Sequence, residues 1–129
     1  MRVLSVDDSF DWLKIHAQTI SRVFGEDTEI ISACSATEAL NIYKENYIEK
    51  PFDIVITDLQ MESDFEPLLA GELLIKEIRN LNLKQKILIV SSTYNIDQIA
   101  SLNHVDYISK RTIVADPISF QTKLEITYK

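Results

Sequence analysis

The sequence predicts an α/β fold: a doubly wound, five-stranded parallel sheet with helices on both faces. Short apolar runs rich in β-branched residues alternate with longer segments in which apolar residues recur at helical spacing. Polar residues follow several of these runs directly, and parallel sheets bind ligands at that end of their strands. Alternating strands and helices imply right-handed crossovers, so the strands should all run in one direction.

The first two strand and helix pairs are marked by the ends of their helices. Residues 3–6 form the first apolar run, and a helical pattern then begins at Ser9, which can cap it, and ends at Gly25. Residues 28–32 form the second β-prone run. A second helix is expected after Ser35, because Ser-Ala-Thr-Glu matches a capping box.

The same alternation continues to the end of the chain. Gly71 stands near the start of the third helix, Asn95 and Gln98 resemble a capping box for the fourth, and Asp116-Pro117 suits the start of the last. The strands that precede these helices are expected over residues 52–57, 86–90 and 105–108. The sequence thus predicts five strand and helix pairs.

Length and composition bound the function. With 129 residues, 46% of them hydrophobic, the chain has the size of one compact domain, and we expect a single domain over residues 1–129. The formal charge is −7 and no basic cluster occurs, which argues against binding to nucleic acid or an anionic membrane. The apolar runs are too short to span a membrane, no signal peptide is recognisable, and Cys34 is the only cysteine. We therefore expect a cytoplasmic protein.

Three carboxylates and one ammonium are expected to meet at the carboxyl edge of the sheet. Asp7 and Asp8 follow the first apolar run and Asp58 follows the third, while Ser91 and Lys110 come after the fourth and fifth. Helix capping would explain Asp8 or Ser91 alone, but it does not explain three converging carboxylates. A bound Mg²⁺ or Mn²⁺ and the lysine would offset their repulsion. Such a site can hold a phosphoryl group, and Asp58 is the candidate nucleophile.

Other metal and phosphate chemistries fit less well. The chain contains two glycines and no glycine-rich loop, so no nucleotide cofactor is expected. His16 and His104 have no second ligand at metal-binding spacing, which argues against zinc and favours surface or packing roles. Trp12 is interpreted as a packing residue of the first helix whose fluorescence would report metal binding.

Four segments resemble motifs of the response-regulator receiver domain of two-component signalling: Val-Asp-Asp-Ser, Phe-Asp-Ile-Val-Ile-Thr-Asp-Leu-Gln-Met, Ile-Leu-Ile-Val-Ser-Ser and Asp-Tyr-Ile-Ser-Lys. They occur in the family's order across essentially the whole chain. The resemblance implies a flavodoxin-like receiver fold with strand order 2-1-3-4-5. It also implies a signalling phosphoprotein of a phosphorelay that promotes its own phosphorylation and dephosphorylation, not an enzyme that turns over an external substrate.

The resemblance assigns roles to individual residues. Asp58 would accept the phosphoryl group. Asp8, Asp58 and the backbone carbonyl of Gln60 would bind Mg²⁺, with Asp7 acting through water. On phosphorylation the Ser91 hydroxyl and the Lys110 ammonium would move to the phosphoryl group. The residues that carry these roles are Asp7, Asp8, Asp58, Gln60, Ser91 and Lys110.

The resemblance also implies a switch and its partners. Tyr107 would turn inward as Ser91 moves, and would repack a face made by the fourth helix, fifth strand and fifth helix. The phosphoryl donor would be a sensor histidine kinase, a phosphotransfer protein or a small donor such as acetyl phosphate. The signal would pass to a downstream effector, to an output domain outside this chain, or to a homodimer formed through that face.

The chain departs from the family pattern on both sides of Asp58. Glu62 replaces the usual proline and Gly71 comes later than usual, which indicates an insertion within residues 62–70. The insertion is interpreted either as a tolerated loop extension or as a segment whose side chains alter kinase docking or water access. Those side chains are Asp64, Phe65 and Glu66.

Arg111 follows Lys110 where the family usually has a cis proline, so we expect a trans bond and a rearranged loop up to Asp116. Arg111 either faces solvent or adds a second cation to the site. Asn103 replaces a helix-ending glycine and can adopt the same left-handed turn.

Two other function classes compete with a phosphorylatable receiver. One is a degenerate receiver that acts as a phosphorylation-independent interaction module. The other is a phosphatase of the haloacid-dehalogenase type, which needs an acid two residues after its nucleophile, where this chain has Gln60. In the receiver family, Gln60 and Thr93 stand at positions that order or block the hydrolytic water.

Overall fold

The protein contains a five-stranded, fully parallel sheet with the order β2-β1-β3-β4-β5. The structure, a computed structural model, describes residues 1–61 and 69–129. The strands are β1 (Arg2–Val6), β2 (Glu29–Ala33), β3 (Ile54–Thr57), β4 (Ile87–Ser91) and β5 (Asp106–Ser109). The predicted doubly wound topology and strand order are therefore confirmed, with strand ends one or two residues from those expected.

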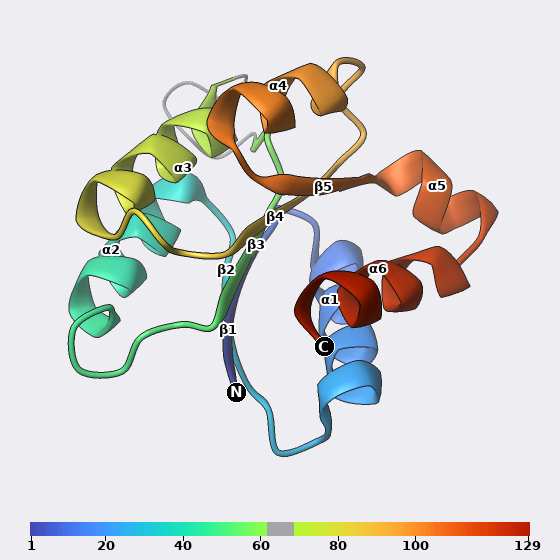
Figure 1. Cartoon of the computed structure of the whole chain (residues 1–129), viewed down its shortest axis with the longest axis horizontal. Coiled ribbons are helices and arrows are strands. Elements are labelled where there is room, and N and C mark those ends of the chain that lie inside the picture. Colours follow the sequence, from blue (N-terminus) through green and yellow to red (C-terminus); the bar gives the residue numbers. More distant parts are fainter. Residues whose placement is uncertain (62–68) are drawn as a thin grey trace.

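Helices cover both faces of the sheet (Figure 1). The described helices are α1 (Phe10–Phe24), α2 (Ala36–Asn46), α3 (Ala70–Leu81), α4 (Ile96–Asn103), α5 (Lys110–Ala115) and α6 (Ile118–Tyr128). In Figure 1, α1 and α6 lie on one face of the sheet, and α2 and α3 lie on the other. Each face is therefore buried against helices, as the apolar runs required.

Two hydrophobic clusters form the core, one on each side of the sheet. The cluster beneath α2, α3 and α4 includes the fully buried Leu4, Tyr43 and Ile78. The cluster beneath α1, α5 and α6 includes Ile56 and Phe120, which are also fully buried. Because successive strand residues point to opposite faces, β1 and β3 contribute to both clusters. Packing on both faces of the sheet thereby fixes the central strands and the residues that follow them.

The ends of the first two helices follow the sequence signals. The Ser9 hydroxyl accepts a hydrogen bond from the Trp12 N–H at 3.4 Å, and α1 ends at Gly25 with a φ of 105°. The Ser35 hydroxyl accepts from the Glu38 N–H at 3.1 Å, as the capping box predicted. Both caps could be predicted from the sequence because each capping residue lies within one turn of the amide that it binds.

The start and end of α4 differ from expectation. Asn95 precedes α4 but makes no side-chain capping bond. The left-handed residue is His104, with a φ of 54°, and not Asn103, which is the last residue of the helix. The Asn103 side-chain amide instead donates to the Ile99 carbonyl at 2.8 Å. The helix therefore runs one residue further than predicted.

The segment expected to be a rearranged loop after Lys110 is a helix. Residues Lys110–Ala115 form α5, and the Ser109 hydroxyl accepts a hydrogen bond from the Arg111 N–H at 3.2 Å. The expected trans Lys110-Arg111 bond is confirmed, since no peptide bond among the described residues is cis. The loop prediction was wrong because six residues are too few to show helical periodicity, while Ile113 can still bury its side chain.

Within the described residues no helix is long and apolar enough to cross a membrane. Most of the insertion, including Glu62, Asp64, Phe65 and Glu66, lies outside the residues that the structure describes.

The last helix begins at Ile118, with Pro117 and not Asp116 at the capping position. Asp116 was predicted to cap this helix, and the residue at the capping position is one further along the chain.

Candidate functional site

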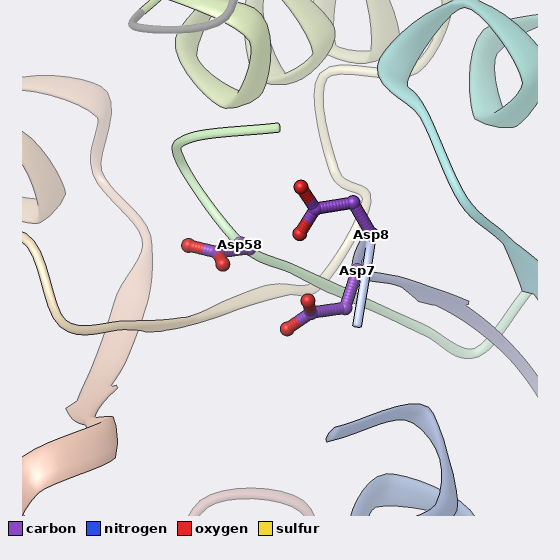
Figure 2. A group of neighbouring side chains, drawn as sticks. All are labelled: Asp7, Asp8 and Asp58. Carbon is purple, nitrogen blue, oxygen red and sulfur yellow. The ribbon is translucent and has the colours of Figure 1, made fainter. Parts of the chain in front are cut away.

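The three aspartates predicted from the sequence lie together at the carboxyl edge of the sheet. Asp7 and Asp8 follow β1, and Asp58 follows β3, its neighbour in the sheet. Val6 pairs with Thr57, so Asp7 and Asp58 leave their strands at the same level. One carboxylate oxygen from each of the three aspartates lies within 4.8 Å of the others. Figure 2 shows the three side chains pointing to the same side.

The ammonium of Lys110 joins two of these carboxylates. Its Nζ lies 2.8 Å from Asp7 Oδ2 and 2.7 Å from Asp58 Oδ2. All three side chains are almost removed from water, with 11% of the Lys110 side chain exposed. Lys110 follows β5, which is separated from β3 by β4. The sheet therefore brings together the charges that the sequence placed after three different strands.

Burial and pairing act against each other on the ionisation of this group. Burial raises the pKa of Asp7, an effect that the hydrogen bond from Lys110 only partly offsets. Burial by itself would lower the pKa of Lys110, but its hydrogen bonds to Asp58 and Asp7 outweigh burial and raise it. Lys110 is therefore a charged ammonium at neutral pH.

Backbone amides hold the Asp58 carboxylate from the other side. The Leu59 N–H donates to Asp58 Oδ1 at 2.6 Å, and the Gln60 N–H makes a longer bond of 3.5 Å to the same oxygen. The Asp58 N–H donates to the Val6 carbonyl at 3.0 Å. Asp58 is thus fixed by the sheet and by the turn that follows it. The metal-binding role of the Gln60 carbonyl stays a prediction.

Gly71 is required by the close approach of α3 to this turn. A Cβ atom at position 71 would lie 2.3 Å from the Asp58 carbonyl oxygen and 2.5 Å from Leu59 Cα. The Gly71 N–H also donates to the Leu59 carbonyl at 2.9 Å. Glycine at this position therefore lets the helix pack directly on the backbone that carries Asp58.

Ser91 ends β4 and is buried, but its hydroxyl is turned to its own loop. Ser91 Oγ lies 2.8 Å from Thr93 Oγ1 and accepts a hydrogen bond from the Thr93 N–H at 3.2 Å. Both of these contacts are with Thr93 and neither is with Asp58. The predicted hydroxyl is thus at the edge of the site and engaged elsewhere, and its role stays a prediction.

Tyr107, the predicted switch residue, is on β5 and 40% exposed. The ammonium of Lys123, from α6, lies 6.0 Å from the centre of its ring. This places the aromatic ring at the outer side of β5, next to α6. The helix predicted as the fifth corresponds to α6, because α5 is an additional short helix. The predicted switch face therefore involves α4, β5 and α6.

Arg111 does not join the carboxylate cluster. Its side chain is exposed, and Nη2 donates to the Ser92 carbonyl at 2.6 Å. Of the two interpretations, the solvent-facing one agrees with the structure. The contact also has a consequence that the sequence did not indicate: it ties the start of α5 to the loop after β4.

Trp12 has a contact that sequence reasoning missed. Lys110 Nζ lies 4.9 Å from the centre of a Trp12 ring. The side chain is half-buried and also packs on the cluster beneath α1, so the predicted packing role is only part of its function. No local signal could have found the contact, since it joins α1 to the far end of β5.

His16 lies beneath the site as a buried packing residue, as one of the sequence interpretations held. Its Nδ1 is 2.8 Å from the Ser5 hydroxyl, and its ring packs edge to face on Phe120 at 5.7 Å. Burial, with a smaller contribution from the charge of Lys110, lowers the pKa of His16 to about 3. The imidazole is therefore neutral at physiological pH.

The donor set of Asp7, Asp8 and Asp58 fits a hard divalent cation. All ligand atoms are carboxylate oxygens, the type that Mg²⁺ prefers. The single ammonium neutralises only part of the negative charge of three carboxylates. Charge and donor chemistry therefore both favour a cation at this edge of the sheet.

Comparisons with known proteins agree with this geometry. A family model of the response regulator receiver domain matches residues 3–116. A receiver domain protein from Clostridium thermocellum is 23% identical, with a TM-score of 0.70 over 97% of this chain and 94% of that chain. CheY in a CheX-CheY-BeF3-Mg²⁺ complex from Borrelia burgdorferi is also 23% identical, with a TM-score of 0.74 over 100% of this chain and 90% of that chain.

NtrX from Brucella abortus, solved with ATP, matches over 97% of this chain but only 28% of its own, with 24% identity and a TM-score of 0.68. No curated protein is significantly similar to this sequence. The structural matches establish the fold, and the family model covers nearly all of the chain. The protein therefore belongs to the response regulator receiver domain family of two-component signal transduction.

Proposed function

We propose that this domain accepts a phosphoryl group on Asp58 and signals through the resulting conformational change. The observation that carries the proposal is the arrangement of Asp58 beside Asp7, Asp8 and the Lys110 ammonium. A carboxylate oxygen of Asp58 attacks phosphorus, and the bond from phosphorus to the donor atom breaks. The donor keeps that electron pair and takes up a proton. For a phosphohistidine donor, the leaving group is the imidazole.

Asp7, Asp8 and Asp58 would hold the metal ion, Mg²⁺ or Mn²⁺. When bound, the ion offsets negative charge on the transferred oxygens. Asp8, Asp58 and the Gln60 carbonyl are the proposed direct ligands, and Asp7 is proposed to act through water. The Borrelia CheY structure contains BeF3 and Mg²⁺, which supports this assignment by homology.

Lys110 supplies the second positive charge. In the unphosphorylated site its ammonium is paired with both Asp7 and Asp58. Transfer adds about one to two negative charges and new acceptor oxygens at Asp58, so the ammonium follows the charge to the phosphoryl group. Because this cation is already in place, it is expected to stabilise the charge that develops during transfer with little rearrangement of the site.

Ser91 and Tyr107 would carry the change to the surface. The Ser91 hydroxyl leaves Thr93 for a phosphoryl oxygen, and Tyr107 turns from its exposed position into the space released. The face formed by α4, β5 and α6 is thereby repacked. A large population change requires the phosphoryl group to favour the active conformer by several kcal/mol, on the order of 5 for near-complete switching.

The partners that fit this function are a sensor histidine kinase or a phosphotransfer protein as donor. The output would be a downstream effector, an output domain outside the chain, or a homodimer through the α4, β5 and α6 face. As part of the same proposal, the protein is a self-modifying switch and not a turnover enzyme, and residues 1–129 act as one domain. Its cytoplasmic location stays a prediction from the sequence.

Intact mass spectrometry tests the proposal. We expect the protein to gain the mass of one phosphoryl group when incubated with acetyl phosphate and Mg²⁺, and to gain none when EDTA replaces the metal. Asp58→Asn should abolish the adduct. Asp11→Asn, the same change at an exposed aspartate of α1, should retain it. No adduct on the unsubstituted protein would overturn the proposal and favour the phosphorylation-independent interaction module.

A further inference from the structure

The indole of Trp12 packs against the ammonium that serves the site. Lys110 Nζ lies 4.9 Å from the centre of a Trp12 ring and pairs with two carboxylates at 2.8 and 2.7 Å. Tryptophan has the aromatic face that attracts a cation most strongly, and the attraction increases when the cation has lost its water. With 11% of its side chain exposed, Lys110 is such a cation. The ammonium thus has anionic partners on one side and an aromatic face on another.

A closed chain of contacts fixes the indole relative to the site. Asp7 Oδ1 accepts a hydrogen bond from the Ser9 N–H at 2.9 Å. The Ser9 hydroxyl in turn accepts from the backbone N–H of Trp12 at 3.4 Å. Asp7 Oδ2 pairs with the same lysine that lies against the ring. One carboxylate therefore sets both the start of α1, from which Trp12 projects, and the end of the lysine side chain.

The backbone around Lys110 makes such support useful. Lys110 is the first residue of a helix of six residues, and Arg111, not proline, follows it. Arg111 ties this segment to the Ser92 carbonyl, but that contact holds the backbone and not the lysine side chain. The end of the lysine side chain is otherwise held by its ion pairs with Asp7 and Asp58, and the pair with Asp58 is the one exchanged during transfer.

We propose that Trp12 is a positioning residue for Lys110: its indole face keeps the ammonium directed at the phosphoryl position while the ion pair with Asp58 is exchanged for phosphoryl oxygens. The proposal rests on the phosphoacceptor function proposed above. The ring favours lysine conformers that direct the ammonium at the phosphoryl position over conformers that turn away, so it acts through the lysine and does not itself contact the phosphoryl group. Loss of this attraction should slow transfer more than it alters the fold.

The electron density of the ring can be varied with little change in its packing. Trp12 and Lys110 line the same surface depression of about 400 Å³, together with Ser92, Arg111 and Val114. Trp12 is also the only tryptophan of the chain. Biosynthetic incorporation of tryptophans with increasing fluorination therefore changes one ring only. Fluorine withdraws electron density from the ring face and weakens cation binding, with little change in shape.

The test measures the rate constant for phosphorylation by acetyl phosphate with saturating Mg²⁺ across the fluorinated series. We expect a stepwise decrease that totals about two- to tenfold, the range that corresponds to a partly buried cation–π contact. Trp12→Phe should recover part of the rate lost in Trp12→Leu. Phe10→Leu, which changes an aromatic residue of α1 that is 79% exposed, should keep the unsubstituted rate. A rate that does not depend on fluorination would overturn the proposal.

A second measurement separates this proposal from the proposed function. The free energy of unfolding in urea is compared across the series in the unsubstituted chain and in Lys110→Met. Fluorination should lower stability only when the ammonium is present. If the unsubstituted protein forms no adduct, the phosphoacceptor function fails, and this coupling alone decides whether Trp12 holds Lys110. Equal effects of fluorination in both backgrounds would show a purely structural ring and overturn the inference.

Discussion

The two halves of the site differ in how firmly the chain fixes them. In the central half, Asp7, Asp8 and Asp58 follow the adjacent interior strands β1 and β3. The Asp7 N–H donates to the Ala33 carbonyl of β2, and the Asp58 N–H donates to the Val6 carbonyl of β1. In the edge half, Ser91 ends β4, and Lys110 follows the edge strand β5. Lys110 reaches the site only through its long side chain. The carboxylates are therefore positioned by the sheet, whereas the cation is positioned by side-chain contacts.

Departures from the family pattern after Lys110 fall on the less constrained half. Arg111 stands where proline is usual, a short helix replaces the expected loop, and Trp12 reaches across from α1. On the central half, Gly71 still packs on the Asp58 backbone although the chain before it is longer. The backbone that carries Asp58 is therefore closely packed, whereas Lys110 is held by side-chain contacts.

The largest effect should come from removing the charge that joins the two halves. Lys110→Met leaves two buried carboxylates facing each other, and breaking a buried ion pair in this way costs about 3–5 kcal/mol of unfolding free energy. The loss should be measured by urea unfolding at pH 7 without divalent ions. Mg²⁺ should restore more stability to the variant than to the unsubstituted protein. Lys14→Met, at an exposed position of α1, is the control, and an equal loss there would contradict the prediction.

Gly71→Ala tests the backbone constraint on the central half. The new methyl group would overlap the Asp58 carbonyl and Leu59 Cα, so the turn or α3 must move, at a cost of about 1–3 kcal/mol. Because the moved turn carries Asp58, we expect Mg²⁺ affinity, measured by titration calorimetry, to fall as well. Gly25→Ala introduces strain at a φ of 105° far from the site. Gly25→Ala should lower the free energy of unfolding and leave Mg²⁺ affinity unchanged. If the two variants bind Mg²⁺ with the same affinity, Gly71 does not constrain the position of Asp58.

His16 beneath the site should give a pH dependence of stability. Its pKa is about 3 in the folded state against an ordinary value of 6.5, so below pH 6.5 the unfolded chain takes up a proton that the folded chain does not. Stability should therefore fall as the pH drops from 6.5 towards 3, by about 1.4 kcal/mol per pH unit. His16→Asn should flatten this slope between pH 6.5 and 5. His104→Asn, at an exposed left-handed position that asparagine tolerates, should retain it.

The smallest effect is expected at the edge half of the site. Arg111→Ala removes the bond to the Ser92 carbonyl, and because this bond is exposed to solvent we expect a loss of less than about 1 kcal/mol. Urea unfolding against Arg22→Ala, an exposed arginine of α1, measures it. A loss as large as that of Lys110→Met would mean that the bond between Arg111 and Ser92, and not the contacts of the Lys110 side chain, fixes the edge half.

The parts that the sequence predicted share a physical cause. Buried parallel strands need continuous apolar runs, so Ile54–Thr57 and the position of Asp58 after it were evident. Helix caps are local, so Ser9 and Ser35 were found. The predicted convergence of Asp7, Asp8 and Asp58 followed from strand direction alone.

The parts that the sequence did not predict depend on contacts between distant segments. α5 is too short to show a period, and its first residues are fixed by bonds to Ser109 and Ser92. The left-handed turn after α4 fell on His104, one residue beyond the better candidate. The contact between Trp12 and Lys110 joins opposite ends of the chain, and neither residue indicates the other.

The proposed function requires phosphoryl transfer at Asp58 and nowhere else. Borohydride reduction of the phosphorylated protein converts an aspartyl phosphate to homoserine, which tandem mass spectrometry of the proteolytic peptides can locate. We predict homoserine at position 58 after treatment with acetyl phosphate and Mg²⁺, with Asp7 and Asp8 unmodified. Homoserine at another aspartate, or none in a protein that has gained the phosphoryl mass, would contradict phosphorylation at Asp58.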